Sequence, residues 1–114
     1  MDSLPVVNPP EIVVTSIEAR VDPPAMNVAC TAFPQAVTVS AQITTSGPTI
    51  VTWRWESSTG TVSDEKNLLF EEGTTKTVQE YYQVNSANDY WIQIRTFSPN
   101  VMIGQANFKV TCEP

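Results

Sequence analysis

Residues 50–60, IVTWRWESSTG, alternate apolar and polar side chains and then reach a turn. Successive side chains of a β-strand point to opposite faces, so Val51, Trp53 and Trp55 share one face. Two indoles on one face could form a platform for a ligand or could fill the interior of a sandwich. Burying both recovers a few kcal/mol each, more than the polar face could supply. We therefore place both tryptophans in the core and Arg54, between them, on the solvent side.

The same alternation recurs along the chain, broken by turn residues, and no segment shows a helical apolar period. Strands are expected at about 12–21, 36–45, 49–57, 66–71, 75–84, 90–97 and 103–112. This pattern predicts an all-β fold, a seven-stranded immunoglobulin-like antiparallel β-sandwich, with a small barrel as the rival architecture. The expected core side chains include Trp53, Trp55, Phe70, Ile92, Ile94 and Phe108.

The chain of 114 residues is long enough for one ordinary domain and too short for two. Residues 1–11, MDSLPVVNPPE, hold three prolines and no alternation, so we interpret them as a linker leading into a single domain at 12–114. The first residues lack a basic segment followed by an apolar one, which a signal peptide needs. We expect a fragment that lacks its targeting sequence.

The net charge of −6 and the six scattered basic residues argue against nucleic acid and anionic membranes as partners, because such binders carry a basic stripe. The sequence has no apolar run of about 18 residues, so it predicts no membrane insertion. As an isolated domain the chain is expected to be a monomer, although an exposed edge strand would offer a route to self-association.

The two cysteines test the proposed strand order. Cys30 falls between the first and second expected strands, and Cys112 closes the last one. Alternating strand directions place both at the same end of the sandwich, which favours a disulfide over two free thiols. The bridge differs from the one between the second and sixth strands of antibody domains. A disulfide implies export, so we expect an extracellular or cell-surface location.

Five segments carry a resemblance: VTWRW at 51–55, LLF at 68–70, GTTKTV at 73–78, WIQIRTFSPN at 91–100 and ANFKVTC at 106–112. Together they resemble bacterial extracellular immunoglobulin-like domains of secreted or surface-anchored proteins, including ectodomains of receptor-type serine/threonine kinases. The resemblance implies extracellular display, spacing or ligand binding without catalysis. Glu80 departs from the pattern, since an apolar residue is expected there. Either the strand carries a bulge at Glu80 or the carboxylate points to the rim. We expect the rim, because an unpaired buried charge is costly.

The residue content argues against an enzyme. The chain has no histidine, which excludes Ser-His-Asp and Cys-His catalysis and most zinc sites, and its four glycines form no phosphate loop. We therefore expect no catalytic residue, no cofactor and no metal. A weak calcium site is the alternative that remains, if two loops converge. Its ligands would come from the adjacent carboxylates Asp64, Glu65, Glu71 and Glu72.

A ligand surface, if present, is expected on the solvent face of the central strands. Its candidate residues are Arg54, Trp91, Gln93 and Arg95, with Tyr81 exposed on the opposite sheet. Trp91 could instead stack on an arginine in a structural cation–π pair. The leading hypothesis is a non-enzymatic extracellular module that acts as a spacer, a protein-interaction domain or a sensor domain. The alternative is a carbohydrate-binding module that uses exposed aromatics, so the possible ligand is a protein or a glycan.

Overall fold

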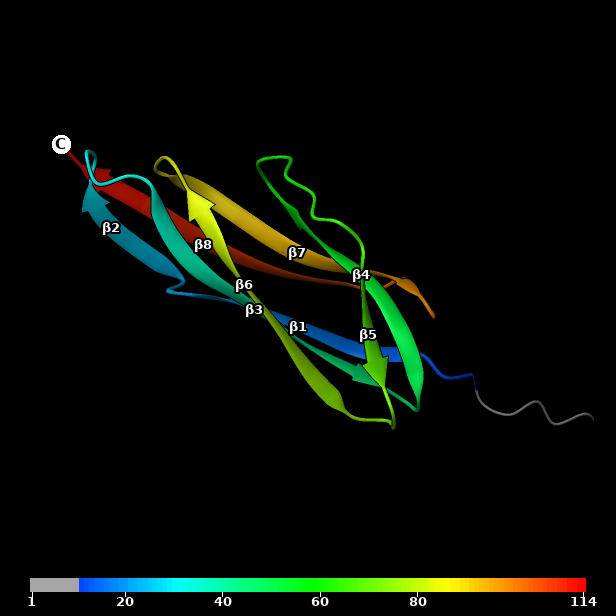
Figure 1. Cartoon of the computed structure of the whole chain (residues 1–114). Coiled ribbons are helices and arrows are strands. Elements are labelled where there is room, and N and C mark those ends of the chain that lie inside the picture. The colour runs from blue at the N-terminus through cyan, green and yellow to red at the C-terminus, as the bar shows by residue number, and fades with distance from the viewer. Residues whose placement is uncertain (1–10) are drawn as a thin grey trace, which may run out of the picture.

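The computed structural model describes residues 11–114, and every regular element in that range is a β-strand (Figure 1). The expected linker at 1–11 lies outside these residues except for Glu11. No helix in the described part is long and apolar enough to cross a membrane. The eight strands are β1 (Val14–Asp22), β2 (Ala25–Ala29), β3 (Gln35–Thr45), β4 (Thr49–Ser57), β5 (Lys66–Phe70), β6 (Thr75–Val84), β7 (Asn88–Ser98) and β8 (Ile103–Glu113).

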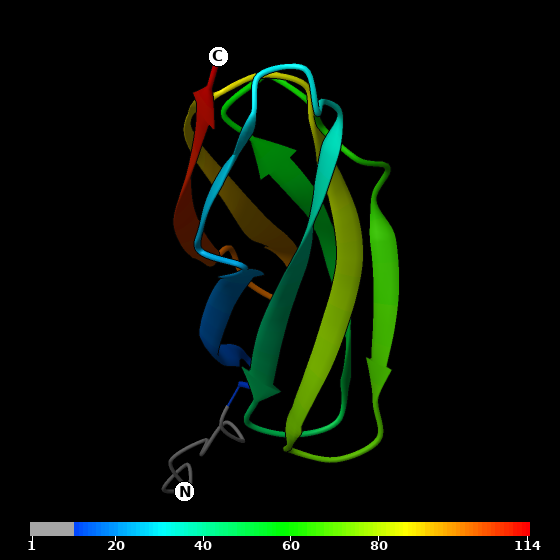
Figure 2. The same ribbon diagram turned by 90° about the vertical axis from the view of Figure 1, so that its left-hand side faces the viewer.

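The strands form two sheets that pack face to face (Figures 1 and 2). One sheet has the order β1-β3-β6, and the other has the order β2-β8-β7-β4-β5. The all-β sandwich predicted from the alternation is confirmed. Two details of the prediction are wrong. The described residues form eight strands rather than seven, and β2 runs parallel to β8 whereas the other neighbouring strands are antiparallel.

The additional strand exists because prolines interrupt the first edge strand. Proline has no N–H to donate to a sheet, so Pro23 and Pro24 end the pairing of β1 with β3. The chain then crosses to the other sheet, where Lys109 donates its N–H to the carbonyl of Pro24 (3.1 Å). The five residues that follow pair with β8 as β2.

The core lies between the sheets, and all six side chains expected in it are buried. Trp53 and Trp55 are 4% and 6% exposed, and their rings meet edge-on with centroids 5.7 Å apart. Neither buried Nε1–H has a hydrogen-bond partner. The apolar area that the two rings bury must therefore outweigh the cost of two unpaired donors.

The two long sides of the sandwich are closed differently. On one side β8 approaches β1 so closely that a Cβ on Gly104 would lie 2.5 Å from Cγ2 of Ile17. On the other side long side chains bridge the edge strands β5 and β6. The Lys66 ammonium contacts the carboxylate of Glu80 (3.0 Å), which is about half exposed and lies at the rim as expected. The β3–β6 register is regular there, so Glu80 requires no bulge.

The S-P-N segment after β7 fixes the start of β1. The Asn100 side chain accepts a hydrogen bond from the Val14 N–H (2.7 Å) and donates one to the Val14 carbonyl (3.1 Å). One amide group thus satisfies both backbone groups of a residue at the end of a strand. The buried Thr96 hydroxyl donates to the Asn100 carbonyl (2.7 Å) and accepts from the Met102 N–H (2.9 Å), which holds the turn.

Replacing Asn100 with Ala is expected to lower the free energy of unfolding by about 1–3 kcal/mol, because Val14 loses both partners in a part-buried place. Urea unfolding followed by circular dichroism measures the change. Asn107→Ala is the matched control, since Asn107 is exposed on β8. Equal stability of the two variants would show that the amide of Asn100 is not needed.

Candidate binding surfaces

Charged side chains gather on the outer face of the five-stranded sheet. The β4–β7 register places Arg54 opposite Arg95 and Glu56 opposite Gln93. Glu56 accepts hydrogen bonds from Arg54 Nη2 (2.7 Å), Arg95 Nε (3.1 Å) and Gln93 Nε2 (2.6 Å). One carboxylate therefore separates two guanidinium groups that would otherwise repel each other across adjacent strands.

The environment of Glu56 stabilises its charged form. Burial of the side chain, which is only 13% exposed, raises the pKa of the carboxyl. The hydrogen bonds from Gln93, Arg54 and Arg95 lower the pKa and outweigh burial, so the net shift is downward from the ordinary value. Glu56 is therefore ionised at neutral pH and keeps both arginines in place.

Glu56→Gln is expected to lower the free energy of unfolding at pH 7 by about 1–3 kcal/mol, since both arginines lose a charged acceptor. The pKa in the folded state lies below the unfolded value of about 4.3, so wild-type Glu56 stabilises the fold above that pH. This contribution is lost as the pH falls through the folded pKa. Urea unfolding of the wild type and of Glu56→Gln at pH 7 and about pH 2 should show a smaller difference in unfolding free energy at the lower pH.

The matched control for this variant is Glu18→Gln, because Glu18 is exposed on β1. Its unfolding free energy should change by less than about 0.5 kcal/mol at either pH. A Glu56→Gln effect of the same size at both pH values would contradict the role given to the charge.

Trp91 does not make the contact expected for it. The Arg54 guanidinium lies over Phe97, with Cζ 5.0 Å from the ring centroid, and not over Trp91. Trp91 is half-buried on the same face, and its backbone exchanges hydrogen bonds with Ser58: its N–H donates to Ser58 Oγ (3.1 Å), and its carbonyl accepts from the Ser58 N–H (3.0 Å). The expected cation–π partner was therefore wrong.

The structure thus brings three candidate residues together and leaves two apart. Arg54, Gln93 and Arg95 meet at Glu56, Trp91 lies further along β7, and Tyr81 lies on β6 in the other sheet. Glu56 and Phe97 were missed as members of this surface. Alternation alone places Glu56 on the outer face of the sheet. Its contacts with Gln93 and Arg95 depend on the β4–β7 register, which cannot be inferred from the alternation. We call Arg54, Glu56, Gln93, Arg95 and Phe97 the outer-face cluster.

Exposed apolar side chains share the face of this cluster. Ile50 on β4 and Leu69 on β5 are direct cross-strand partners, and both are more than half exposed. Ile103 on β8 is the partner of Arg95 and is 46% exposed. Apolar groups therefore lie on this face on both sides of the charged cluster.

Tyr81 borders a second surface, a groove beside β6. Two adjoining pockets of about 210 and 510 Å³ share Thr61, Tyr81 and Tyr82. The first reaches the core between the sheets and has the Lys66–Glu80 ion pair at its rim, whereas the second lies between β6 and the connections at 58–65 and 85–87. We call this surface the β6 groove, defined by Thr59, Thr61, Tyr81, Tyr82, Gln83 and Asn85.

Two tyrosines fix the connections that flank the groove. The Tyr82 hydroxyl hydrogen-bonds the Thr59 hydroxyl (2.8 Å), and the Tyr90 hydroxyl donates to the Ser86 carbonyl (2.6 Å). The second contact is the tyrosine corner typical of immunoglobulin-like sandwiches. Both tyrosine rings pack on Phe108, at 6.1 and 5.1 Å between centroids. The walls of the groove are therefore anchored in the core.

The calcium alternative finds no support in the described part of the chain. Residues 11–114 contain no group of three or more acidic or cysteine side chains placed to hold a metal ion. Asp64, Glu65, Glu71 and Glu72 are all exposed.

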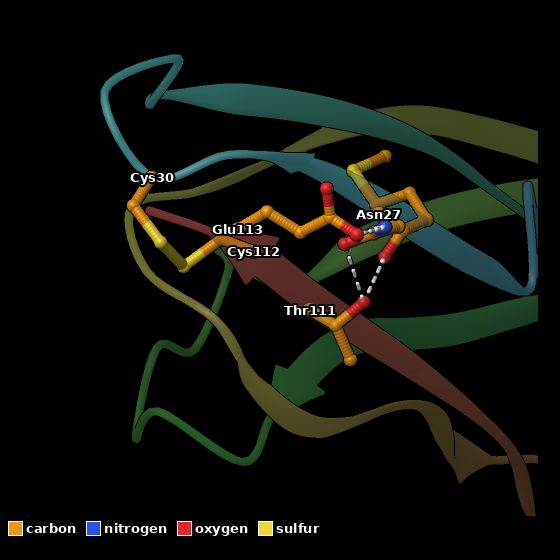
Figure 3. The surroundings of a disulfide bond; sticks show 6 residues. Asn27, Cys30, Thr111, Cys112 and Glu113 are labelled. Atoms are coloured by element: carbon orange, nitrogen blue, oxygen red, sulfur yellow. Dashed lines mark hydrogen bonds between the residues drawn. A yellow bond between two sulfur atoms is a disulfide. The ribbon is translucent and has the colours of Figure 1, made fainter.

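The two cysteines form a disulfide at the end of the sandwich where the chain leaves β8 (Figure 3). Their Cα atoms are 4.9 Å apart, and the Cys30 N–H donates to the Glu113 carbonyl (2.8 Å). Beside the bond, Asn27 donates to Glu113 (3.0 Å) and accepts from Thr111 (3.0 Å). The bond therefore fastens β2 and the connection after it to the last strand.

No protein-family model and no curated protein sequence matches the chain. Solved structures do match. The CARDB domain of a Pyrococcus furiosus protein, in complex with di-metal ions, has a TM-score of 0.64 at 10% identity, over 88% of this chain and 96% of that one. The Pseudomonas fluorescens alkylpurine DNA glycosylase AlkC, bound to DNA with an abasic site analog, has a TM-score of 0.59 at 12% identity. That match covers 83% of this chain and 30% of the glycosylase, and both likenesses concern the fold alone.

Proposed function

We propose that the chain is a non-enzymatic, extracellular immunoglobulin-like module that binds a protein partner through the outer face of its five-stranded sheet. The observation that carries this proposal is the outer-face cluster, in which Glu56 holds two arginines in place between exposed apolar side chains. Protein interfaces are enriched in arginine and in apolar anchors of this kind.

The cluster is organised before any partner arrives. Arg54 is fixed by Glu56 and by the ring of Phe97, and Arg95 is fixed by the same carboxylate. Side chains that are already ordered lose less conformational entropy when they bind. Two guanidinium groups and one carboxylate leave one positive charge on a domain whose net charge is −6, which suits an acidic patch on the partner.

The non-enzymatic role and the extracellular location are supported by the residue content and by the disulfide. The absence of histidine from the sequence and the lack of a metal-holding cluster in residues 11–114 support a role without catalysis. The disulfide supports an oxidising compartment. The described chain begins and ends at opposite ends of the sandwich (Figure 2), a path that suits a module set between others in a row.

Variants of the outer face test this proposal. Immobilised wild-type domain should enrich a protein from a surface or secreted fraction of its source cells, and Ile103→Lys and Leu69→Lys should lose it, because each places a charge in an apolar contact. Gln42→Lys is the matched control, since Gln42 is exposed on β3 in the other sheet. Enrichment that Ile103→Lys and Leu69→Lys leave unchanged would refute the proposal.

A further inference from the structure

We infer that the β6 groove binds a neutral saccharide, with the ring of Tyr81 as the surface on which a sugar stacks. The saccharide site lies in the larger pocket, whose lining shares no residue with the outer-face cluster. Its test can therefore fail while the protein-binding proposal stands, and the converse also holds. Three features of the groove carry the inference: its charge, the groups that line it and the rigidity of its walls.

The groove is uncharged on a strongly acidic domain. The larger pocket has no Asp, Glu, Lys or Arg among its lining residues, although the chain carries 12 acidic side chains. In the smaller pocket Lys66 and Glu80 neutralise each other at 3.0 Å. Glu56, the third charged residue of that lining, is paired with Arg54 and Arg95. A charged ligand would find no free counter-charge in the larger pocket, whereas a neutral ligand meets no repulsion there.

The lining groups match the two sides of a sugar. Tyr81 is 78% exposed, which leaves its ring open to the apolar C–H face of a pyranose. Around it lie the hydroxyls of Thr59 and Thr61 and the amides of Gln83 and Asn85, which can donate to and accept from sugar hydroxyls. An aliphatic ligand would displace water from these polar groups without offering hydrogen bonds in its place, so the chemistry favours a polyhydroxylated one.

The hydrogen-bonding groups are already arranged in a network. The Thr59 hydroxyl lies 2.8 Å from that of Tyr82, 2.9 Å from that of Ser57 and 3.2 Å from that of Thr61. Gln83 donates to Asn85 (3.1 Å), which orients the two amides. Because these groups need little reorganisation, a ligand that meets them loses less affinity to ordering.

An extended peptide added to the free edge of β6 is the competing occupant. The inward side of this edge carries Lys76 and Glu80, which reach across to β5 at the Leu69 carbonyl (2.5 Å) and at Lys66. Inward-pointing charges are one way in which proteins keep an edge strand from pairing with another chain. The observations therefore favour the saccharide.

A glycan array that displays neutral and acidic oligosaccharides tests the inference with the intact domain. A neutral oligosaccharide should bind, and ¹⁵N-detected NMR titration with it should shift the amides of residues 59–61 and 81–86. Tyr81→Ala should weaken binding at least about tenfold, and Tyr81→Phe, which keeps the ring, by less than about threefold. Tyr81 is exposed, so neither variant should disturb the fold.

Trp91→Ala is the matched control, because Trp91 is an aromatic residue on the opposite sheet. This variant should bind the same oligosaccharide with unchanged affinity. The inference is overturned if no neutral oligosaccharide binds, if only acidic ones bind, or if Trp91→Ala abolishes binding while Tyr81→Ala does not. It is also overturned if a peptide shifts the β6 amides and no glycan does.

Discussion

Trp55→Ala is expected to lower the free energy of unfolding by about 3–5 kcal/mol, the loss typical when a large buried aromatic side chain is truncated. Trp55 is 6% exposed, packs edge-on against Trp53 and forms part of the wall of the smaller pocket in the β6 groove. Removing the indole would leave a cavity between the two sheets that rigid strands cannot close. Urea unfolding followed by far-ultraviolet circular dichroism measures the loss without relying on tryptophan fluorescence.

Trp91→Ala is the control for this prediction, because it removes the same side chain from the outer face, where the indole is only half-buried. Its cost should be less than half that of Trp55→Ala. Small domains are stable by only about 5–15 kcal/mol, so the Trp55 variant should be partly unfolded well below the wild-type midpoint. Equal losses for the two variants would show that Trp55 does not join the sheets.

Replacing both Cys30 and Cys112 with Ser is expected to lower the free energy of unfolding by about 4.5 kcal/mol, because the bond joins residues that are 82 positions apart. The open chain gains conformational freedom in the unfolded state, and the turn after β2 loses its covalent link to β8. Thermal unfolding of the variant, and of the wild type with reductant, should give matching midpoints.

The control is the variant with both cysteines replaced by Ser, because adding reductant to it should leave its thermal midpoint unchanged. Asn27 and Thr111 beside the bond should keep β2 paired in the folded variant, so its circular dichroism spectrum should match that of the wild type. A wild-type midpoint that reductant leaves unchanged would contradict the stabilising role of the bond.

Much of the fold follows from the sequence, because strands with one buried face alternate strictly. The expected strands at 49–57 and 75–84 coincide with β4 and β6, and the one at 66–71 differs from β5 by a single residue. In each of these strands, apart from Glu80 in β6, burial separates one face from the other, so the period of two is visible. The disulfide was predictable for a related reason, because alternating strand directions place Cys30 and Cys112 at the same end of the sandwich.

What the sequence did not reveal depends on partners distant in the chain. β2 has five residues, and none of them is fully buried, so AMNVA shows too little contrast to differ from a loop. The contacts of Glu56 with Gln93 and Arg95 depend on the β4–β7 register, which shifts between Thr52 and Trp53. The β6 groove lies between β6 and two connections, and the connections have no periodic pattern to interpret.

We propose that the chain is an exported module closed by the Cys30–Cys112 bond, and intact mass after alkylation measures whether that bond forms. Domain isolated from an oxidising compartment is denatured and treated with iodoacetamide, with and without prior reduction. We expect no adduct without reductant and two adducts after reduction. Two adducts without reductant would mean free thiols in both positions and would contradict the proposal.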